Sequence, residues 1–165
     1  MKKKIKVLQV IPKLSYGGTE TGCYDLAHFL PEQDCKSFIV TSGGELLKFV
    51  NKEKVKIFRL PVHSKNPILI LFNAIIISLI ILLYNISIVH ARSRAPAWSC
   101  LLATKLTARK FVTTFHGTYN FSNRFKKIYN SVMVRSHLVI AGSNFIFSHI
   151  NENYGDFFSN KKRKL

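Results

Sequence analysis

Six short, apolar, β-rich runs alternate with helix-like segments along this chain, and this alternation is the feature that most constrains its fold. Within each run the apolar residues follow one another instead of alternating with polar ones, which is typical of strands buried on both faces of a sheet. Such strands joined by helical crossovers form a doubly wound, mostly parallel α/β sheet. The sequence therefore predicts an α/β fold with strands at residues 5–11, 37–41, 55–60, 86–91, 110–115 and 137–141.

The segments between these runs carry helix signals. In residues 19–30, apolar side chains recur at the i, i+3, i+4, i+7 spacing of one helical face. Pro96 suits the first turn of a helix, whereas Ser143 can cap a last helix that Gly155 would end. Further helices are expected at residues 45–50, 68–86, 96–107 and 122–135, and the last helix should bury Ile146, Ile150 and Tyr154.

The length of 165 residues suits one domain with its own core. We assign residues 1–155 to this domain and residues 156–165, which include the run NKKRKL, to a basic tail. The three cysteines are far apart and form no Cys-x-x-Cys or Cys/His cluster, so we expect neither a disulfide framework nor a zinc site. Reduced thiols favour a cytosolic setting, and the N-terminal apolar run is too short for a signal peptide.

Residues 68–86 form a 19-residue segment without a charged side chain, long enough to cross a bilayer. Its polar residues Asn73, Ser78 and Asn85 do not gather on one helical face, so the helix should be either fully enclosed or in contact with lipid. Lys and Arg are divided almost equally before and after the segment, which sets no orientation. A span would also divide the predicted sheet between two sides of the membrane. We therefore favour a buried or membrane-touching helix over a transmembrane one.

Polar residues and glycines follow four of the predicted strands. In an open parallel sheet, ligands bind outside the carboxyl ends of the strands, so these residues should share one edge. A helix beginning near Thr19 would also attract anions to its first turn. The candidate binding residues at the four strand exits are Gly17, Gly18, Thr19 and Glu20, then Arg92, then His116, Gly117 and Thr118, and finally Ser143.

Each candidate also has a purely structural interpretation. The pair Gly17-Gly18 can simply form a turn, and His90, inside an apolar strand, is more typical of a hydrogen-bonded core histidine. His116 differs because the context TTFHGTY places it at a strand exit beside a glycine. There is no Gly-x-Gly-x-x-Gly pattern, and no Asp-x-Asp pair offers carboxylate ligands for a divalent metal.

Four segments in order, VLQVIPKLSYGGTE, IVHARSRAPAW, TFHGTY and LVIAGSNFI, resemble the N-terminal domain of a family 4 glycosyltransferase with the GT-B fold. The resemblance spans nearly all of residues 6–154, and it implies a Rossmann-like domain. It also implies transfer of a sugar from a nucleotide-sugar donor, with retention of configuration and without a metal or other cofactor. In this family the glycine loop faces the donor phosphates and the acceptor, which implies that role for Gly17 and Gly18. His116 matches the histidine that contacts the donor sugar near its reacting carbon.

The same resemblance implies a second Rossmann-like domain that binds the nucleotide. The sequence ends at Leu165, near the point where that domain should begin, so we expect this chain to need a C-terminal domain for activity, either in the same polypeptide or as a separate subunit. The expected acceptor is a cell-surface glycan or a lipid-linked molecule. The alternative is a non-catalytic remnant that binds a membrane or a partner.

The formal net charge of +17 favours anionic partners. With the apolar helix, it suits a peripheral position at the cytoplasmic face of an anionic plasma membrane. Nucleic acid is a less favoured partner, because aromatic and basic residues do not interleave in an RNA-binding pattern and no helix-turn-helix signal is present.

Overall fold

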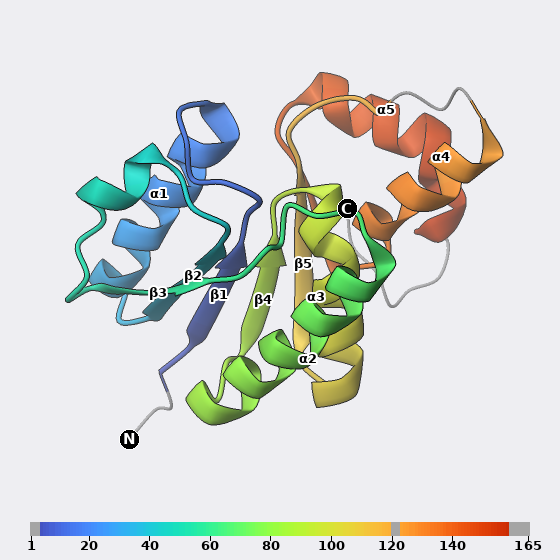
Figure 1. Cartoon of the computed structure of the whole chain (residues 1–165). Coiled ribbons are helices and arrows are strands. Elements are labelled where there is room, and N and C mark those ends of the chain that lie inside the picture. The colour runs from blue at the N-terminus through green and yellow to red at the C-terminus, as the bar shows by residue number, and fades with distance from the viewer. Residues whose placement is uncertain (1–3, 120–122, 159–165) are drawn as a thin grey trace.

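The computed structural model describes residues 4–119 and 123–158 and contains a six-stranded, fully parallel sheet. The strand order is β3-β2-β1-β4-β5-β6 (Figure 1). All six predicted strands are confirmed, with ends that differ by one or two residues. Their bounds are β1 Lys6–Val10, β2 Lys36–Thr41, β3 Val55–Arg59, β4 Ile88–Ala91, β5 Lys110–Phe115 and β6 Leu138–Ala141.

Helical segments connect the strands and cover both faces of the sheet. The α-helices are α1 Gly18–Glu32, α2 Pro67–Tyr84, α3 Arg94–Thr107, α4 Arg124–Asn130 and α5 Asn144–Tyr154. The described residues also form three 3₁₀ helices: η1 Glu45–Phe49, η2 Ser131–Val134 and η3 Gly155–Phe157. This is the predicted doubly wound α/β architecture.

Two hydrophobic cores lie on opposite faces of the sheet because successive strand residues point to opposite sides. Phe38 joins the core that contains Ile77 of α2, whereas the next residue, Ile39, joins the core that contains Cys23 and Ala27 of α1. Helices α1 and α2 therefore cover different faces (Figure 1).

Helix α2 is not enclosed on all sides, which excludes one of the two arrangements expected for it and leaves a helix with an exposed apolar face. Only about a third of it is buried (33%), and its outer face exposes large apolar side chains. The polar residues Asn73 and Ser78 instead lie on the buried side, where Asn73 Nδ2 donates to the Pro61 carbonyl and the Ser78 hydroxyl to the Ala74 carbonyl. Because both polar side chains lie on the inner side, the outer face is left apolar. The exposed residues are Ile68, Leu71, Phe72, Ile75, Leu79, Leu82 and Leu83.

Other helices differ from the prediction at their ends. The described part of the basic helix expected over residues 122–135 begins at Arg124 and breaks into η2 at Ser131; residue 122 lies outside the described residues. Segment 45–50 is a 3₁₀ helix of five residues. Gly155 is not a left-handed stop, because its φ of −49° and ψ of −39° are right-handed and the chain continues into η3.

Candidate functional site

The strand order reverses between β1 and β4, and we refer to the carboxyl edge of the sheet at this point as the crevice. From β1 the chain winds through β2 to β3, and from β4 it winds the other way through β5 to β6. Such a point of reversal is where open α/β sheets bind ligands. The loop after β1, with Gly17 and Gly18, and the residue after β4, Arg92, flank this point.

The glycine pair opens helix α1 without backbone strain. Gly17 is the N-cap, with an extended φ of 161°, and no side chain caps the helix. Space around Gly18 is open, since a Cβ added there would have no neighbour within 4 Å. A Cβ on Gly17 would instead lie 2.5 Å from Glu20 Oε2, so the Glu20 carboxylate lies beside the helix N-terminus, where a negative charge is favoured.

A glycine outside this pair, Gly44, supports the loop after β1, although its sequence context did not predict such a role. Gly44 has a φ of +132°, and a Cβ there would lie 2.3 Å from the backbone carbon of Leu14. Leu14 is in the loop after β1, and its N–H donates to the Gly43 carbonyl at 2.7 Å. The sequence does contain a signal for this role, because a glycine pair follows β2 as another follows β1.

Arg92 is a buried cation beneath the start of α1. It is 7% exposed, and its Nε donates to Gln9 Oε1 at 2.9 Å. Gln9 in turn donates from Nε2 to the Cys23 carbonyl at 3.0 Å, which ties the guanidinium to both β1 and α1. Loss of hydration lowers the pKa of Arg92. No carboxylate forms an ion pair with Arg92 within the described residues, so its charge is available to an anion in the crevice. Gln9 was missed as a supporting residue, although a polar residue within the run VLQVI was a signal.

His116 lies at the exit of β5, exposed at the edge of the crevice. Its pKa is lowered, first by partial loss of hydration and then by the positive charge of Arg92, while the carboxylate of Glu20 acts in the opposite direction. Two predicted residues, Arg92 and Glu20, thus act electrostatically on a third, His116. A neutral imidazole there can accept or donate a hydrogen bond.

His90 is a core histidine, in agreement with its structural interpretation. It is 5% exposed, and its Nε2 lies 2.7 Å from the Thr114 hydroxyl. Burial, with smaller effects from Arg92 and His116, lowers its pKa to about 3. We therefore do not include it in the site.

The remaining candidates lie at the same edge of the sheet. Within the described residues, no hydrogen bond or ion pair joins their side chains to Arg92, His116 or Glu20. The Ser143 hydroxyl caps α5 by accepting a hydrogen bond from the Ile146 N–H at 3.3 Å, as its capping interpretation predicted. Thr118 is exposed and Gly117 half-buried in the loop after β5. Thr19 is half-buried in the first turn of α1. No group of three potential metal-ligating side chains occurs in residues 4–119 and 123–158.

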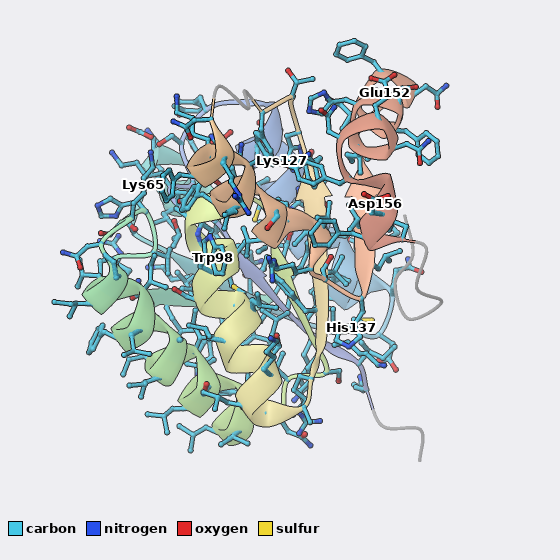
Figure 2. All side chains as sticks on the ribbon, turned by 90° about the vertical axis from the view of Figure 1, so that its right-hand side faces the viewer. Lys65, Trp98, Lys127, His137, Glu152 and Asp156 are labelled. Atoms are coloured by element: carbon cyan, nitrogen blue, oxygen red, sulfur yellow. The ribbon has the colours of Figure 1, made fainter. Side chains whose placement is uncertain are left out.

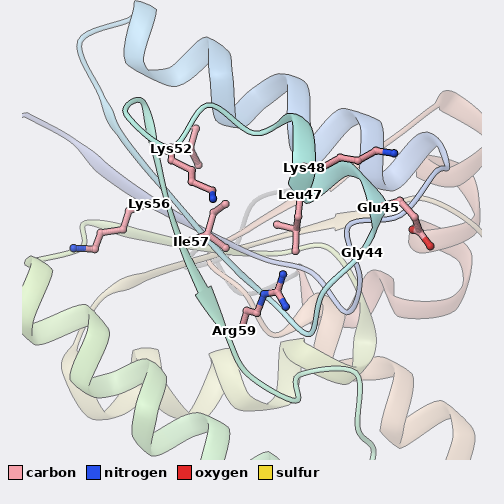
Figure 3. A pocket seen from close by; sticks show the side chains of 9 residues that line it. Gly44, Glu45, Leu47, Lys48, Lys52, Lys56, Ile57 and Arg59 are labelled. Atoms are coloured by element: carbon pink, nitrogen blue, oxygen red, sulfur yellow. The ribbon is translucent and has the colours of Figure 1, made fainter.

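A cavity of about 780 Å³ lies elsewhere. It borders the outer face of edge strand β3 beside η1, where Lys52, Ile57 and Arg59 surround one space (Figure 3). Strands β2 and β1 separate β3 from β4, so this cavity is not part of the crevice at Arg92.

Comparison with known proteins identifies the class that this fold and site define. The family model of Glycosyltransferase Family 4 matches residues 16–162, and the chain belongs to this family. The resemblance seen in the four sequence segments is therefore confirmed. No curated protein matches the sequence.

Solved structures share the fold of this chain. A glycosyltransferase from Rickettsia africae is 45% identical, with a TM-score of 0.81, over 98% of this chain and 42% of that one. Anabaena HepE, solved in complex with UDP-glucose, is 15% identical, with a TM-score of 0.66, over 91% of this chain and 41% of its own. A putative UDP-N-acetylglucosamine 2-epimerase from Listeria monocytogenes has the same fold at 16% identity and a TM-score of 0.66. The chain thus spans less than half the length of each of these proteins.

Proposed function

We propose that this chain forms the acceptor-side half of a sugar-transfer site that uses a nucleotide-sugar donor. The observation that carries the proposal is the buried Arg92 charge, which lies beside Gly22 of α1 and acts on the exposed His116 at the point where the sheet reverses direction. The membership in Glycosyltransferase Family 4 and the UDP-glucose bound by HepE support a donor of this class.

The proposed reaction breaks the bond between the anomeric carbon and the diphosphate oxygen. An acceptor hydroxyl oxygen forms the new bond to that carbon with retention of configuration, and its proton passes to the departing diphosphate. The N-terminus of α1 and Arg92 stabilise negative charge, and His116 lies beside the oxocarbenium-like sugar. These residues require no metal ion for this chemistry.

The nucleotide would be held by a second Rossmann-like domain, either in the same polypeptide or in a separate subunit. In this arrangement Gly17 and Gly18 line the phosphates, with Thr19 and Glu20 in the same turn of α1. Gly117, Thr118 and Ser143 line the far side of the crevice.

We further propose a peripheral position at the cytoplasmic face of the plasma membrane. Helix α2 is long and apolar enough to span a bilayer, but its inner face packs against the sheet and α3. The exposed apolar face of α2 supports contact with lipid instead. The proposed acceptor, a lipid-linked molecule or a cell-surface glycan, would be reached at this membrane. The same face favours the second candidate function, a non-catalytic membrane-bound module.

The variant His116→Ala tests the catalytic proposal when this chain is co-expressed with a complementing nucleotide-binding domain. We expect sugar transfer to fall by about 10²-fold or more, since removal of one stabilising group from such a site has an effect of that order. His28→Ala is the matched control, because His28 packs against Tyr24 on α1, away from the crevice. Full turnover by a folded His116→Ala enzyme would remove His116 from the mechanism.

A further inference from the structure

Strand β3 stands at the end of the strand order, so one of its edges has no neighbouring strand within the described residues. The cavity of about 780 Å³ between β3 and η1 borders this strand (Figure 3), and we call it the β3 groove. Figure 2 shows the other side of the molecule, where Trp98, Lys127 and His137 lie, and the β3 groove is turned away from the viewer there. The groove is therefore a surface of its own, away from α4 and α5.

The β3 groove is lined from both faces of the strand. Ile57 packs against the core that contains α1, whereas Phe58 packs against the core that contains α2, so odd and even residues of β3 point to opposite faces. Ile57 and Lys56, which belong to different faces, both line the groove. The Lys56 ammonium lies 4.5 Å from the centre of the Tyr84 ring, on the α2 side. A space lined from both faces lies at the edge of the strand, where the backbone can be reached.

The backbone of β3 turns hydrogen-bonding groups toward this edge. Leu60 follows β3, and its N–H donates to the Thr41 carbonyl of β2 at 3.1 Å. In a parallel ladder, the N–H and C=O of one residue point to the same neighbour, and those of the next residue point the other way. Phe58 therefore pairs with β2 as Leu60 does, whereas Ile57 and Arg59 direct their N–H and C=O groups away from β2. Unpaired edge groups of this kind are a template for an added strand.

The side chains beside these backbone groups limit what can be added. Leu47 and Val55 form an apolar part of the lining and are 8% and 1% exposed. Lys52 and Arg59 point into the same space (Figure 3), and neither is in an ion pair with a described carboxylate. The groove thus combines unpaired backbone groups, an apolar wall and two cations.

One acidic residue, Glu45, also lines the groove, but other neighbours compensate its charge. Hydrogen bonding by the Ser15 side chain lowers the pKa of Glu45, and the positive charges of Lys13 and Lys48 contribute to this decrease. The Glu45 side chain points away from Lys52 in Figure 3. A negatively charged ligand in the groove would therefore meet mainly cations.

We propose that the β3 groove binds an extended, acidic segment of a partner protein, which joins the sheet as a further strand beside β3. The backbone of this segment pairs with Ile57 and Arg59, and its carboxylates meet Lys52 and Arg59. A second copy of this chain does not fit, because its own β3 would bring the same cations to the edge. An oligonucleotide would meet the cations but has no peptide backbone to pair with β3.

A blocked octapeptide of alternating valine and glutamate is a probe for such a segment. It should bind the chain at least about 10-fold more tightly than the same peptide with lysine in place of glutamate, because like charges oppose the second. Equal affinities of these two peptides would overturn the proposal. Equally tight binding of a short oligothymidylate would also overturn it, because charge alone would then explain the binding.

Backbone pairing is tested with a matched peptide that is N-methylated at its two central residues. Methylation keeps the charge but blocks hydrogen bonds on both edges of the peptide, so binding should weaken at least about 10-fold. Equal affinity of the methylated peptide would contradict the addition of a strand.

Amide hydrogen exchange locates the added strand residue by residue. The acidic peptide should slow exchange of the Ile57 and Arg59 N–H groups at least about 10-fold, because both become hydrogen-bonded. Phe58 is the internal control, since its N–H already pairs with β2. Peptide bound without protection of Ile57 and Arg59 would lie elsewhere and would contradict the proposal.

Two substitutions of Arg59 separate charge from backbone pairing. Arg59→Gln and Arg59→Pro both remove the cation, but only proline also removes the outward N–H, a change that an edge strand tolerates. Arg59→Pro should therefore bind the acidic peptide at least about 5-fold more weakly than Arg59→Gln, the effect of roughly one hydrogen bond. Equal affinities of the two folded variants would exclude pairing at Arg59. If Arg59→Pro does not fold, the methylated peptide decides the same question.

Lys52→Gln tests the charge of the groove. It should weaken the acidic peptide about 3-fold or more, as expected for the loss of one exposed ion pair. Lys110→Gln is the matched control, because Lys110 is also exposed but lies on β5 and does not line the groove. Equal affinities of these two variants would show that net charge, and not this groove, holds the peptide. His116→Ala should bind the peptide as the unchanged chain does, so this test is independent of sugar transfer.

Discussion

His90 and His116 belong to neighbouring strands of one sheet, yet their surroundings give them different chemistry. His90 lies within β4, covered on both sides, and its ring contacts the Thr114 hydroxyl. His116 lies just beyond β5, where solvent and the crevice reach it. Position relative to the strand end therefore distinguishes a structural histidine from a candidate catalytic one, and this could be predicted from the sequence.

The buried His90 should make stability depend on pH. Its pKa is about 3 in the folded chain against an ordinary 6.5, so between these values the unfolded state binds a proton that the folded state does not. The free energy of unfolding should therefore decrease as the pH falls below 6.5, by about 1.4 kcal/mol per pH unit from this group. Urea unfolding at pH 4.5 to 7.5 measures the slope.

Two variants separate titration from hydrogen bonding at this position. His90→Asn should flatten the slope, because no titrating ring remains, although His116, whose pKa is also lowered, keeps part of it. Thr114→Val removes the hydrogen-bond partner and should lower stability while retaining the slope. An unchanged slope in His90→Asn would show that another group titrates.

The residues that support the candidate site were harder to predict than the candidate residues at the strand exits. Gly44 is required because its backbone packs against that of Leu14, and Gln9 because it orients Arg92. Both act through partners distant in the sequence, Gln9 and Arg92 being 83 residues apart. Local patterns identify a glycine pair or a polar residue in a strand, but not the contact that it makes.

At the scale of elements, the positions of the strands could be predicted well, whereas the choice of which face of α2 is buried and which is exposed could not. The strands carry a local signal in their continuous apolar runs. Helix α2 is apolar on every side, so its sequence contains no polar stripe to mark the outer face. Packing against the sheet and α3 decides which residues are buried, and that information is not local.

Two isoleucines of α2 test this sidedness with the same substitution. Ile77 is fully buried and Ile75 is 51% exposed. Ile77→Ala should lower the free energy of unfolding by about 2–5 kcal/mol, the usual cost of such a cavity. Ile75→Ala should change it by less than about 0.5 kcal/mol. Equal losses in urea unfolding would mean that both sides of α2 are covered in solution.

For the whole molecule, charge and apolar surface combine. The net charge of +17 attracts the chain to an anionic surface, and the α2 face offers apolar side chains for insertion. The sequence indicated both properties. It could not show that they occur on one domain with the candidate site, since that depends on the strand order.

Membrane binding should therefore contain an electrostatic and an apolar part. We expect the chain to sediment with phosphatidylglycerol vesicles at about 0.1 M salt, and 1 M salt should weaken the binding because it screens charges beyond roughly 3 Å. Leu79→Asp should reduce binding at both salt concentrations, since it places a charge on the exposed face of α2.

Phe29→Asp is the matched control: Phe29 is similarly exposed (52% against 49%) but lies on α1, across the sheet, and the charge change is the same. If both variants lose affinity equally, charge alone holds the protein at the vesicle and the α2 face does not insert; if Leu79→Asp alone loses affinity, α2 is the face that meets the lipid.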